Sequence, residues 1–117
     1  MVEANPGTFR ELVCKISGKK LADLDTFSKS DPVCVLHKHV QNGISPALSS
    51  TEMILNDLNP EFRTPIKFRV DENNLEERLI FRMWDDDAII GESTNRTNDD
   101  LIGEAYCTVN ALIHRSQ

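Results

Sequence analysis

Five aspartates stand at the ends of runs that read as β-strands, in two regions far apart in the sequence. They are Asp25, Asp31, Asp85, Asp87 and Asp100. If the fold brings these strand ends together, two carboxylate oxygens from each residue converge on one place. Such a cluster repels itself unless a hard cation fills it, and Ca²⁺, which takes about six to eight oxygen ligands, suits it best.

The spacing of the aspartates has a mechanical interpretation. Asp25 and Asp31 flank a loop that folds back on itself, and Asp85 and Asp87 are two residues apart, so they point the same way if the strand direction persists. Asp100 follows the long polar segment 88–99, at the point where we expect the chain to come back to the other aspartates. The backbone carbonyls of Leu24 and Asp86 are additional candidate ligands.

The aspartates have two other possible interpretations. An EF-hand is excluded, because the positions after Asp85 that should carry an oxygen ligand and a glycine are Ile89 and Ile90. Aspartate is also common in solvated turns, where it hydrogen-bonds nearby backbone. Any one of the five fits that description, but the set at these strand ends favours a metal site.

Three apolar residues are predicted at loop tips beside the acidic cluster, namely Phe27, Ile89 and Ile90. One interpretation is that they fold back onto the body of the domain. The other is that they enter the acyl boundary of a membrane, where apolar burial is favourable by about 25 cal/mol per Å².

Composition restricts the class of protein. The chain has 117 residues, 39% hydrophobic and 27% charged, which suits one globular domain. Its 19 acidic and 13 basic residues give a net charge of -6 and leave no basic stripe, which argues against nucleic acid as a partner. No apolar run approaches the roughly 20 residues of a membrane span, and residues 1–8 lack the pattern of a secretory signal. The three cysteines sit in strand-like runs, as free thiols in a reducing compartment would.

Six short runs predict strands separated by polar turns, and together they indicate an all-β antiparallel Greek-key sandwich. They span 10–17, 33–40, 51–55, 65–70, 78–84 and 101–109. Leu79, Phe81 and Met83 share one face of the most hydrophobic run. The sequence predicts one or two helical turns over residues 109–116. It predicts a flexible tail over residues 1–8.

These motifs resemble the C2 domain family of calcium-dependent membrane-binding modules. The stretch 21–32 looks like the family's first calcium loop, 58–62 like its second-loop Asn-Pro motif, and 83–87 with 100–104 like its third loop. All five aspartates of the family's ligand pattern are present. Within the family the chain looks most like the first C2 domain of the copines, with calcium loops at 24–31, 56–62 and 85–100.

The resemblance implies a C2 domain over 9–117, an eight-stranded sandwich of the permuted type II topology. Because only six strands are predicted, we expect the sandwich to lack the family's last two strands, and the open sheet edges would then allow oligomers. Some relatives carry a lysine-rich strand that binds phosphoinositides. The corresponding residues 50–55 contain Glu52 and no lysine, so we expect no strong calcium-independent phosphoinositide site.

The function implied is calcium-dependent binding of anionic phospholipid membranes with two or three Ca²⁺ ions. A cytoplasmic protein would then move to the inner face of the plasma membrane when calcium rises. The alternative is a calcium-independent protein–protein interaction module. Catalysis is not expected, because no nucleophile lies beside a base and no P-loop is present, although an acidic cluster holding Mg²⁺ or Mn²⁺ can serve phosphoryl transfer.

Overall fold

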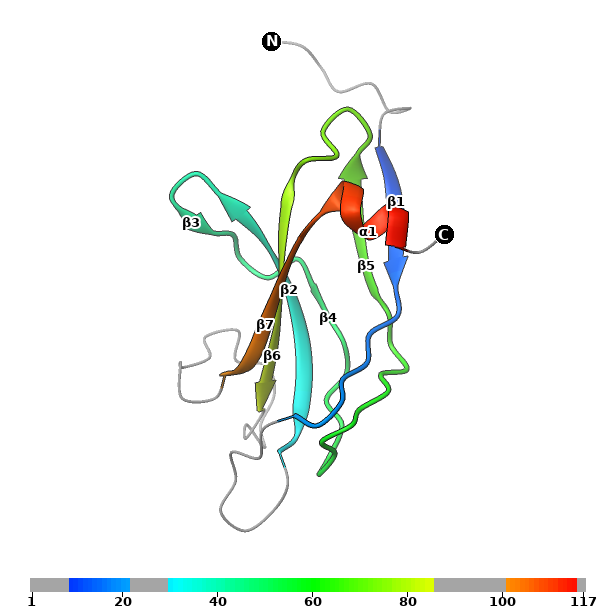
Figure 1. The fold of residues 1–117 in the computed structure, drawn as a ribbon, viewed down its shortest axis with the longest axis vertical. Helices are drawn as coiled ribbons and strands as arrows, with labels where there is room; N and C mark the ends of the chain where they lie inside the picture. The colour runs from blue at the N-terminus through cyan, green and yellow to red at the C-terminus, as the bar shows by residue number, and fades with distance from the viewer. Residues whose placement is uncertain (1–8, 22–29, 86–100, 116–117) are drawn as a thin grey trace.

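The computed structural model describes residues 9–21, 30–85 and 101–115, and the statements below concern these residues. They form seven strands and one helix (Figure 1). The elements are β1 (Phe9–Cys14), β2 (Pro32–Val40), β3 (Gly43–Ile44), β4 (Ser49–Ser50), β5 (Ile66–Asp71), β6 (Arg78–Asp85), β7 (Leu101–Thr108) and α1 (Val109–Arg115).

Two antiparallel sheets face each other as a β-sandwich. One contains β1 and β5, and the other has the order β3-β2-β6-β7, with β4 also paired to β2. The two-residue alternation in β5 explains its orientation, since Ile66, Phe68 and Val70 are buried while the residues between them are exposed. The all-β antiparallel sandwich predicted from the sequence is therefore confirmed.

The core lies between the sheets. Leu36 and Leu79 of the larger sheet are fully buried and belong to one cluster with Ile66, Phe68 and Val70 of the smaller one. Each buried side chain of this size contributes about 1.5–3 kcal/mol relative to an exposed one. A second cluster is formed by Val33, Val35 and Trp84, which pack with Met53 and Leu101.

Helix α1 follows β7 directly and packs Leu112 and Ile113 against the main core cluster. The Thr108 hydroxyl accepts a hydrogen bond from the Ala111 N–H at 3.0 Å, as an N-cap residue does. Val109 is fully buried, and its N–H bonds to the carbonyl of Glu77 at 2.9 Å. The predicted helical turns at the end of the chain are therefore present.

One predicted strand is wrong. Residues 51–55 are not a strand, and the nearby strand is β4, two residues earlier; β3 was not predicted at all. The Thr51 hydroxyl accepts the Cys34 N–H at 2.9 Å, in the place where a strand would offer its carbonyl. The backbone still follows β2, because Thr51 and Ile54 donate to the carbonyls of Cys34 and Pro32 at 2.9 and 3.0 Å.

Candidate calcium site

Sheet pairing brings two of the five predicted aspartates together. Strand β2 begins at Pro32 and the antiparallel β6 ends at Asp85, and these two residues are partners in the ladder. Asp31 precedes Pro32, so Asp31 and Asp85 lie side by side at one end of the sandwich (Figure 1).

The two carboxylates are held by hydrogen bonds that the backbone donates. Asp85 Oδ1 accepts the N–H of Asp31 at 2.9 Å, and Asp85 is only 1% exposed. Asp31 Oδ1 accepts the N–H of Asn56 at 2.7 Å. These backbone donors fix the positions of both carboxylates where the two strands meet.

The second predicted loop meets the same place. The Asp57 N–H donates to the carbonyl of the buried Ser30 at 3.1 Å, and Asn56 adopts a left-handed φ of 51°. Asparagine tolerates that region better than most residues. Further along the loop, Asn59 Oδ1 accepts the N–H of Lys20 at 2.9 Å. Residues 56–59 are thereby hydrogen-bonded to the chain on both sides of the first predicted loop.

The remaining predicted site residues lie outside the described residues. They are the aspartates Asp25, Asp87 and Asp100, the carbonyl donors Leu24 and Asp86, and the apolar residues Phe27, Ile89 and Ile90. Over 9–21, 30–85 and 101–115, no three metal-ligating side chains form a group. The described pair is therefore part of the predicted ligand set.

The chemistry of the described donors fits a hard cation. Asp31 and Asp85 both supply carboxylate oxygens, and one oxygen of each is positioned by a backbone N–H. Ca²⁺ prefers such ligands and tolerates irregular geometry, whereas Zn²⁺ would favour nitrogen or sulfur.

Leu55 is a candidate site residue that the sequence interpretation missed. Its side chain is 66% exposed, the highest value among the exposed large hydrophobic residues of the described chain. It lies between Ile54, whose N–H bonds to Pro32, and Asn56, whose N–H bonds to Asp31. An apolar leucine immediately before the polar residues 56–60 is the signal in the sequence, but the strand predicted over 51–55 includes it.

Glu52 has a structural role beside the site. Its carboxylate accepts the N–H groups of Arg63 and Thr64 at 2.8 and 3.1 Å, which joins residue 52 to the segment after the second loop. Burial opposes ionisation of Glu52, but these hydrogen bonds outweigh it and lower the pKa of the carboxyl group. Glu52 thus fixes the backbone at Arg63 and Thr64 through its carboxylate.

The cysteines are free thiols, as predicted. Cys34 is buried, while Cys14 and Cys107 are partly buried. Burial raises the pKa of Cys34 to about 12, and burial followed by the neighbouring Cys107 raises that of Cys14. Thiols with raised pKa values are poor nucleophiles at neutral pH, so Cys14 and Cys34 are not activated thiols.

Comparison with known proteins now identifies the class. The family model described as "C2 domain" matches residues 11–117, and the chain therefore belongs to the C2 domain family. It is 34% identical to Copine-A of Dictyostelium discoideum over 103 residues, covering 86% of this chain and 15% of that protein. It is 28% identical to Protein BONZAI 2 of Arabidopsis thaliana, covering 94% of this chain and 19% of that protein.

Among solved structures, the chain is similar to BON1-C2B. The TM-score is 0.65 at 28% sequence identity, covering 91% of this chain and 67% of that one. The resemblance to copines is thereby confirmed, although the chain spans less than a fifth of the copine-type relatives above. In the described residues, no helix has the length and apolar character needed to cross a membrane.

Proposed function

We propose that this C2 domain binds anionic phospholipid membranes in a calcium-dependent manner. The observation that carries the proposal is the hydrogen-bonded junction of Asp31, Asp85 and the 56–59 loop at one end of the sandwich. Two or three Ca²⁺ ions would be held there by Asp25, Asp31, Asp85, Asp87 and Asp100, with carbonyl oxygens from Leu24 and Asp86.

Charge makes the calcium dependence work as a switch. Without metal, five carboxylates repel an anionic surface, and the whole chain has a net charge of -6. Two divalent ions neutralise most of the five charges and three reverse the sign, so the local field becomes attractive. Lipid phosphate or carboxylate oxygens then complete the coordination that the protein leaves open.

Apolar loop residues would increase the affinity for the membrane once calcium has neutralised the negative charge of the loops. Phe27, Ile89 and Ile90 are candidates from the sequence, and the exposed Leu55 joins them at the end of the molecule where Asp31 lies. In the cell, the domain would move from the cytoplasm to the inner face of the plasma membrane as calcium rises. No catalytic step is proposed.

The test is co-sedimentation with phosphatidylserine-containing liposomes across a calcium titration, with a chelator control. The wild-type chain should pellet only with calcium. Asp31→Asn and Asp85→Asn keep an oxygen that can accept the observed backbone hydrogen bonds but remove charge, so both should shift the titration to higher calcium or abolish pelleting.

Asp71→Asn is the matched control. Asp71 Oδ1 also accepts a backbone N–H, from Asn73 at 2.9 Å, but it lies at the end of β5 away from the site (Figure 1). This variant should pellet like the wild type. Failure of the folded wild-type chain to pellet at millimolar calcium would overturn the proposal, and calcium-independent pelleting would contradict the switch.

A further inference from the structure

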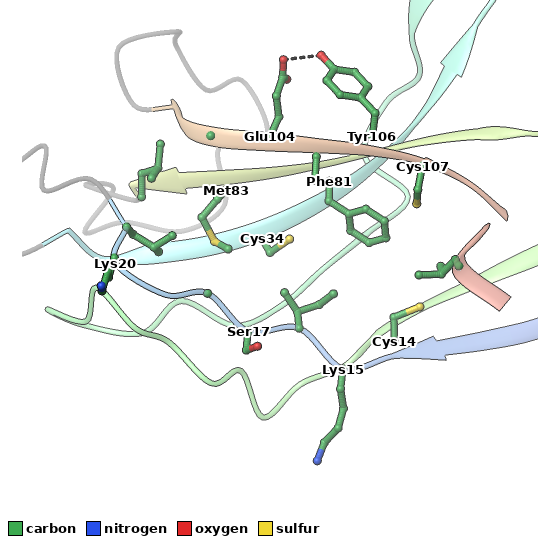
Figure 2. Close-up of a pocket in the computed structure, with 17 residues that line it drawn as sticks. Cys14, Lys15, Ser17, Lys20, Cys34, Phe81, Met83, Glu104, Tyr106 and Cys107 are labelled. Carbon is green, nitrogen blue, oxygen red and sulfur yellow. Dashed lines mark hydrogen bonds between the residues drawn. The ribbon is translucent and has the colours of Figure 1, made fainter. Parts of the chain in front are cut away.

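The outer face of the larger sheet can be mapped from the pairing of its strands. Leu79 and Cys107 are partners in the β6-β7 ladder, and both turn towards the core. Because successive residues alternate between faces, their neighbours Arg78 and Thr108, which are also partners, lie on the outer face. Figure 2 shows the Tyr106 side chain on the opposite side of the strand from that of Cys107. A strand added at the edge of either sheet would lie beside these outer side chains and would not cover them.

An open pocket of about 440 Å³ lies on this outer face, where β6 begins. It is lined by residues of three strands, namely His39 of β2, Arg78 of β6, and Tyr106, Cys107 and Thr108 of β7. The register of the ladders puts His39 on one side of Arg78 and Thr108 on the other. Neighbouring strands are about 4.8 Å apart, so these three side chains form a row about 10 Å long across the sheet.

Each side chain of this row can donate a hydrogen bond. The Arg78 guanidinium presents a planar fork of N–H groups, and the His39 imidazole supplies another N–H. The Thr108 hydroxyl accepts the Ala111 N–H at 3.0 Å, which positions its oxygen while its own proton can still be donated. Among the described residues, no carboxylate lines the pocket. The row is therefore suited to an anion.

The charge of Arg78 is not compensated within the part of the chain that the structure describes. Two acidic residues are near it in the fold, but Glu77 pairs with Lys38 at 3.1 Å and Glu104 pairs with Arg82 at 3.0 Å. Arg78 itself is exposed and forms no ion pair over 9–21, 30–85 and 101–115. Its guanidinium is thus available to an anion from outside this part of the chain.

The donors suit a phosphate monoester better than other common anions. A phosphorylated side chain carries about two negative charges and three acceptor oxygens, which matches one donor group from each of the three strands. A carboxylate has only two oxygens, and an inositol polyphosphate would call for more cations than the single arginine here. The guanidinium fork also binds phosphate through two parallel hydrogen bonds.

The position of the pocket favours a partner protein over a lipid headgroup. Arg78 begins β6 and Asp85 ends it. Seven residue steps of about 3.3 Å separate the two ends by about 23 Å. A bilayer that contacts the loops beside Asp85 is therefore too far away to place a headgroup at Arg78.

We infer that the outer face of the larger sheet binds a phosphorylated side chain of a partner protein, in the pocket formed by His39, Arg78 and Thr108. The choice of a protein rests on the proposed membrane-binding end of the domain. The pocket itself requires neither calcium nor lipid, so the domain could hold a phosphorylated protein before and after it reaches a membrane.

The experiment is fluorescence anisotropy in chelator and without lipid. The probes are fluorescein-labelled degenerate peptide libraries with a fixed central phosphotyrosine or phosphoserine, and the same libraries without phosphate. At least one phosphorylated library should bind, and its unphosphorylated counterpart should not. An NMR titration of the ¹⁵N-labelled chain with the bound library should shift the amides of residues 39, 78 and 106–108.

Arg78→Gln should raise the dissociation constant for the phosphorylated library by about tenfold or more, because it removes the charged donor fork. Arg78→Lys keeps the charge without the fork and should recover only part of the affinity. Arg69→Gln is the matched control. Arg69 is also an exposed strand arginine, but it belongs to β5 of the smaller sheet, where its guanidinium lies 4.7 Å from the centre of the Phe9 ring. This variant should bind like the wild type.

Equal binding of phosphorylated and unphosphorylated libraries overturns the inference, and so does an equal loss of affinity in Arg69→Gln. Binding to phosphatidic acid liposomes in chelator, without binding of either phosphorylated library, would assign the pocket to a lipid and also overturn it. Circular dichroism checks that each variant is folded. Arg78→Gln should still pellet with liposomes and calcium, so failure of the phosphate pocket and failure of the proposed membrane function are separate results.

Discussion

Individual side chains at the site end of the molecule divide into those that bear charge and those that position the chain. Asp31 and Asp85 are charged groups whose oxygens also accept backbone N–H bonds. Asn56 provides one of those donors from a left-handed conformation. A single residue here can therefore affect both the charge of the site and the shape of its loops.

Leu55 should contribute to membrane affinity without contributing to calcium binding. Replacing it with Ala removes apolar area at the site end, so the liposome-bound fraction at saturating calcium should fall, with a dissociation constant up to about tenfold higher. Calcium titration monitored without lipid should be unchanged. Equal pelleting of Leu55→Ala and the wild type on liposomes of the same composition would show that this side chain stays in water.

Glu52 should matter for stability in a pH-dependent way. Its folded-state pKa is lowered, so its contribution is present above the unfolded value of about 4.3 and is lost as pH falls through the folded value. Glu52→Gln should reduce the free energy of unfolding at neutral pH by less than about 1 kcal/mol, because the group is partly exposed. Urea unfolding at several pH values measures it.

The difference between Glu52→Gln and the wild type should shrink as the pH falls below the unfolded pKa of about 4.3 and disappear once the pH is below the lowered folded-state pKa of Glu52. Glu61→Gln serves as the comparison, since the exposed Glu61 side chain makes no hydrogen bond or ion pair in the described part of the chain. If the difference in the free energy of unfolding between Glu52→Gln and the wild type stayed the same at acidic pH, the charge of Glu52 would not be its cause.

Among the described strands, β2 has the most pairing partners, because it pairs with β3, β4 and β6. Leu36 in its middle is fully buried in the main core. Leu36→Ala should lower the free energy of unfolding by about 2–5 kcal/mol through lost burial and the cavity left behind. Leu55→Ala, at an exposed position, should change it by less than about 0.5 kcal/mol. Similar denaturation midpoints for these two variants would contradict the assignment of the core.

The longer strands could be predicted because their alternation is regular. Ile66, Phe68 and Val70 read as one face in the sequence and are buried in the fold. The two-residue strands β3 and β4 are too short to show a period, and at Thr51 a side-chain hydroxyl replaces the ladder carbonyl. Such local competition is invisible to a pattern of apolar residues.

The candidate site was only partly predictable for a related reason. The proximity of Asp31 and Asp85 follows from two strand ends pairing antiparallel, which the sequence pattern supports. The exposure of Leu55 depends on where segment 51–54 stops following β2, and the pattern of apolar residues does not predict that point. Asp25, Asp87 and Asp100 lie outside the described residues and stay predictions.

At the scale of the whole molecule, calcium should stabilise the fold even without lipid, because a ligand that binds only the folded state raises its stability. The gain is about 2.7 kcal/mol at a hundredfold excess over the dissociation constant. Differential scanning fluorimetry should show a higher Tm with calcium than with chelator, and a smaller shift with Mg²⁺, which demands stricter geometry.

Asp85→Asn should remove most of that calcium-induced shift, while Asp71→Asn should keep it. A wild-type Tm that does not respond to calcium would count against the metal site whatever the liposome result. That result would instead favour a calcium-independent protein–protein interaction module.

The direction of β1 has one more consequence. The chain leaves β1 towards the end where β2 begins and β6 terminates (Figure 1). On the way, the N–H groups of Gly18 and Leu21 donate to the carbonyls of Pro60 and Leu58 at 2.9 Å. The segment that leads into the first predicted loop is thus attached to the second, so calcium bound at one loop should also slow amide exchange in the other.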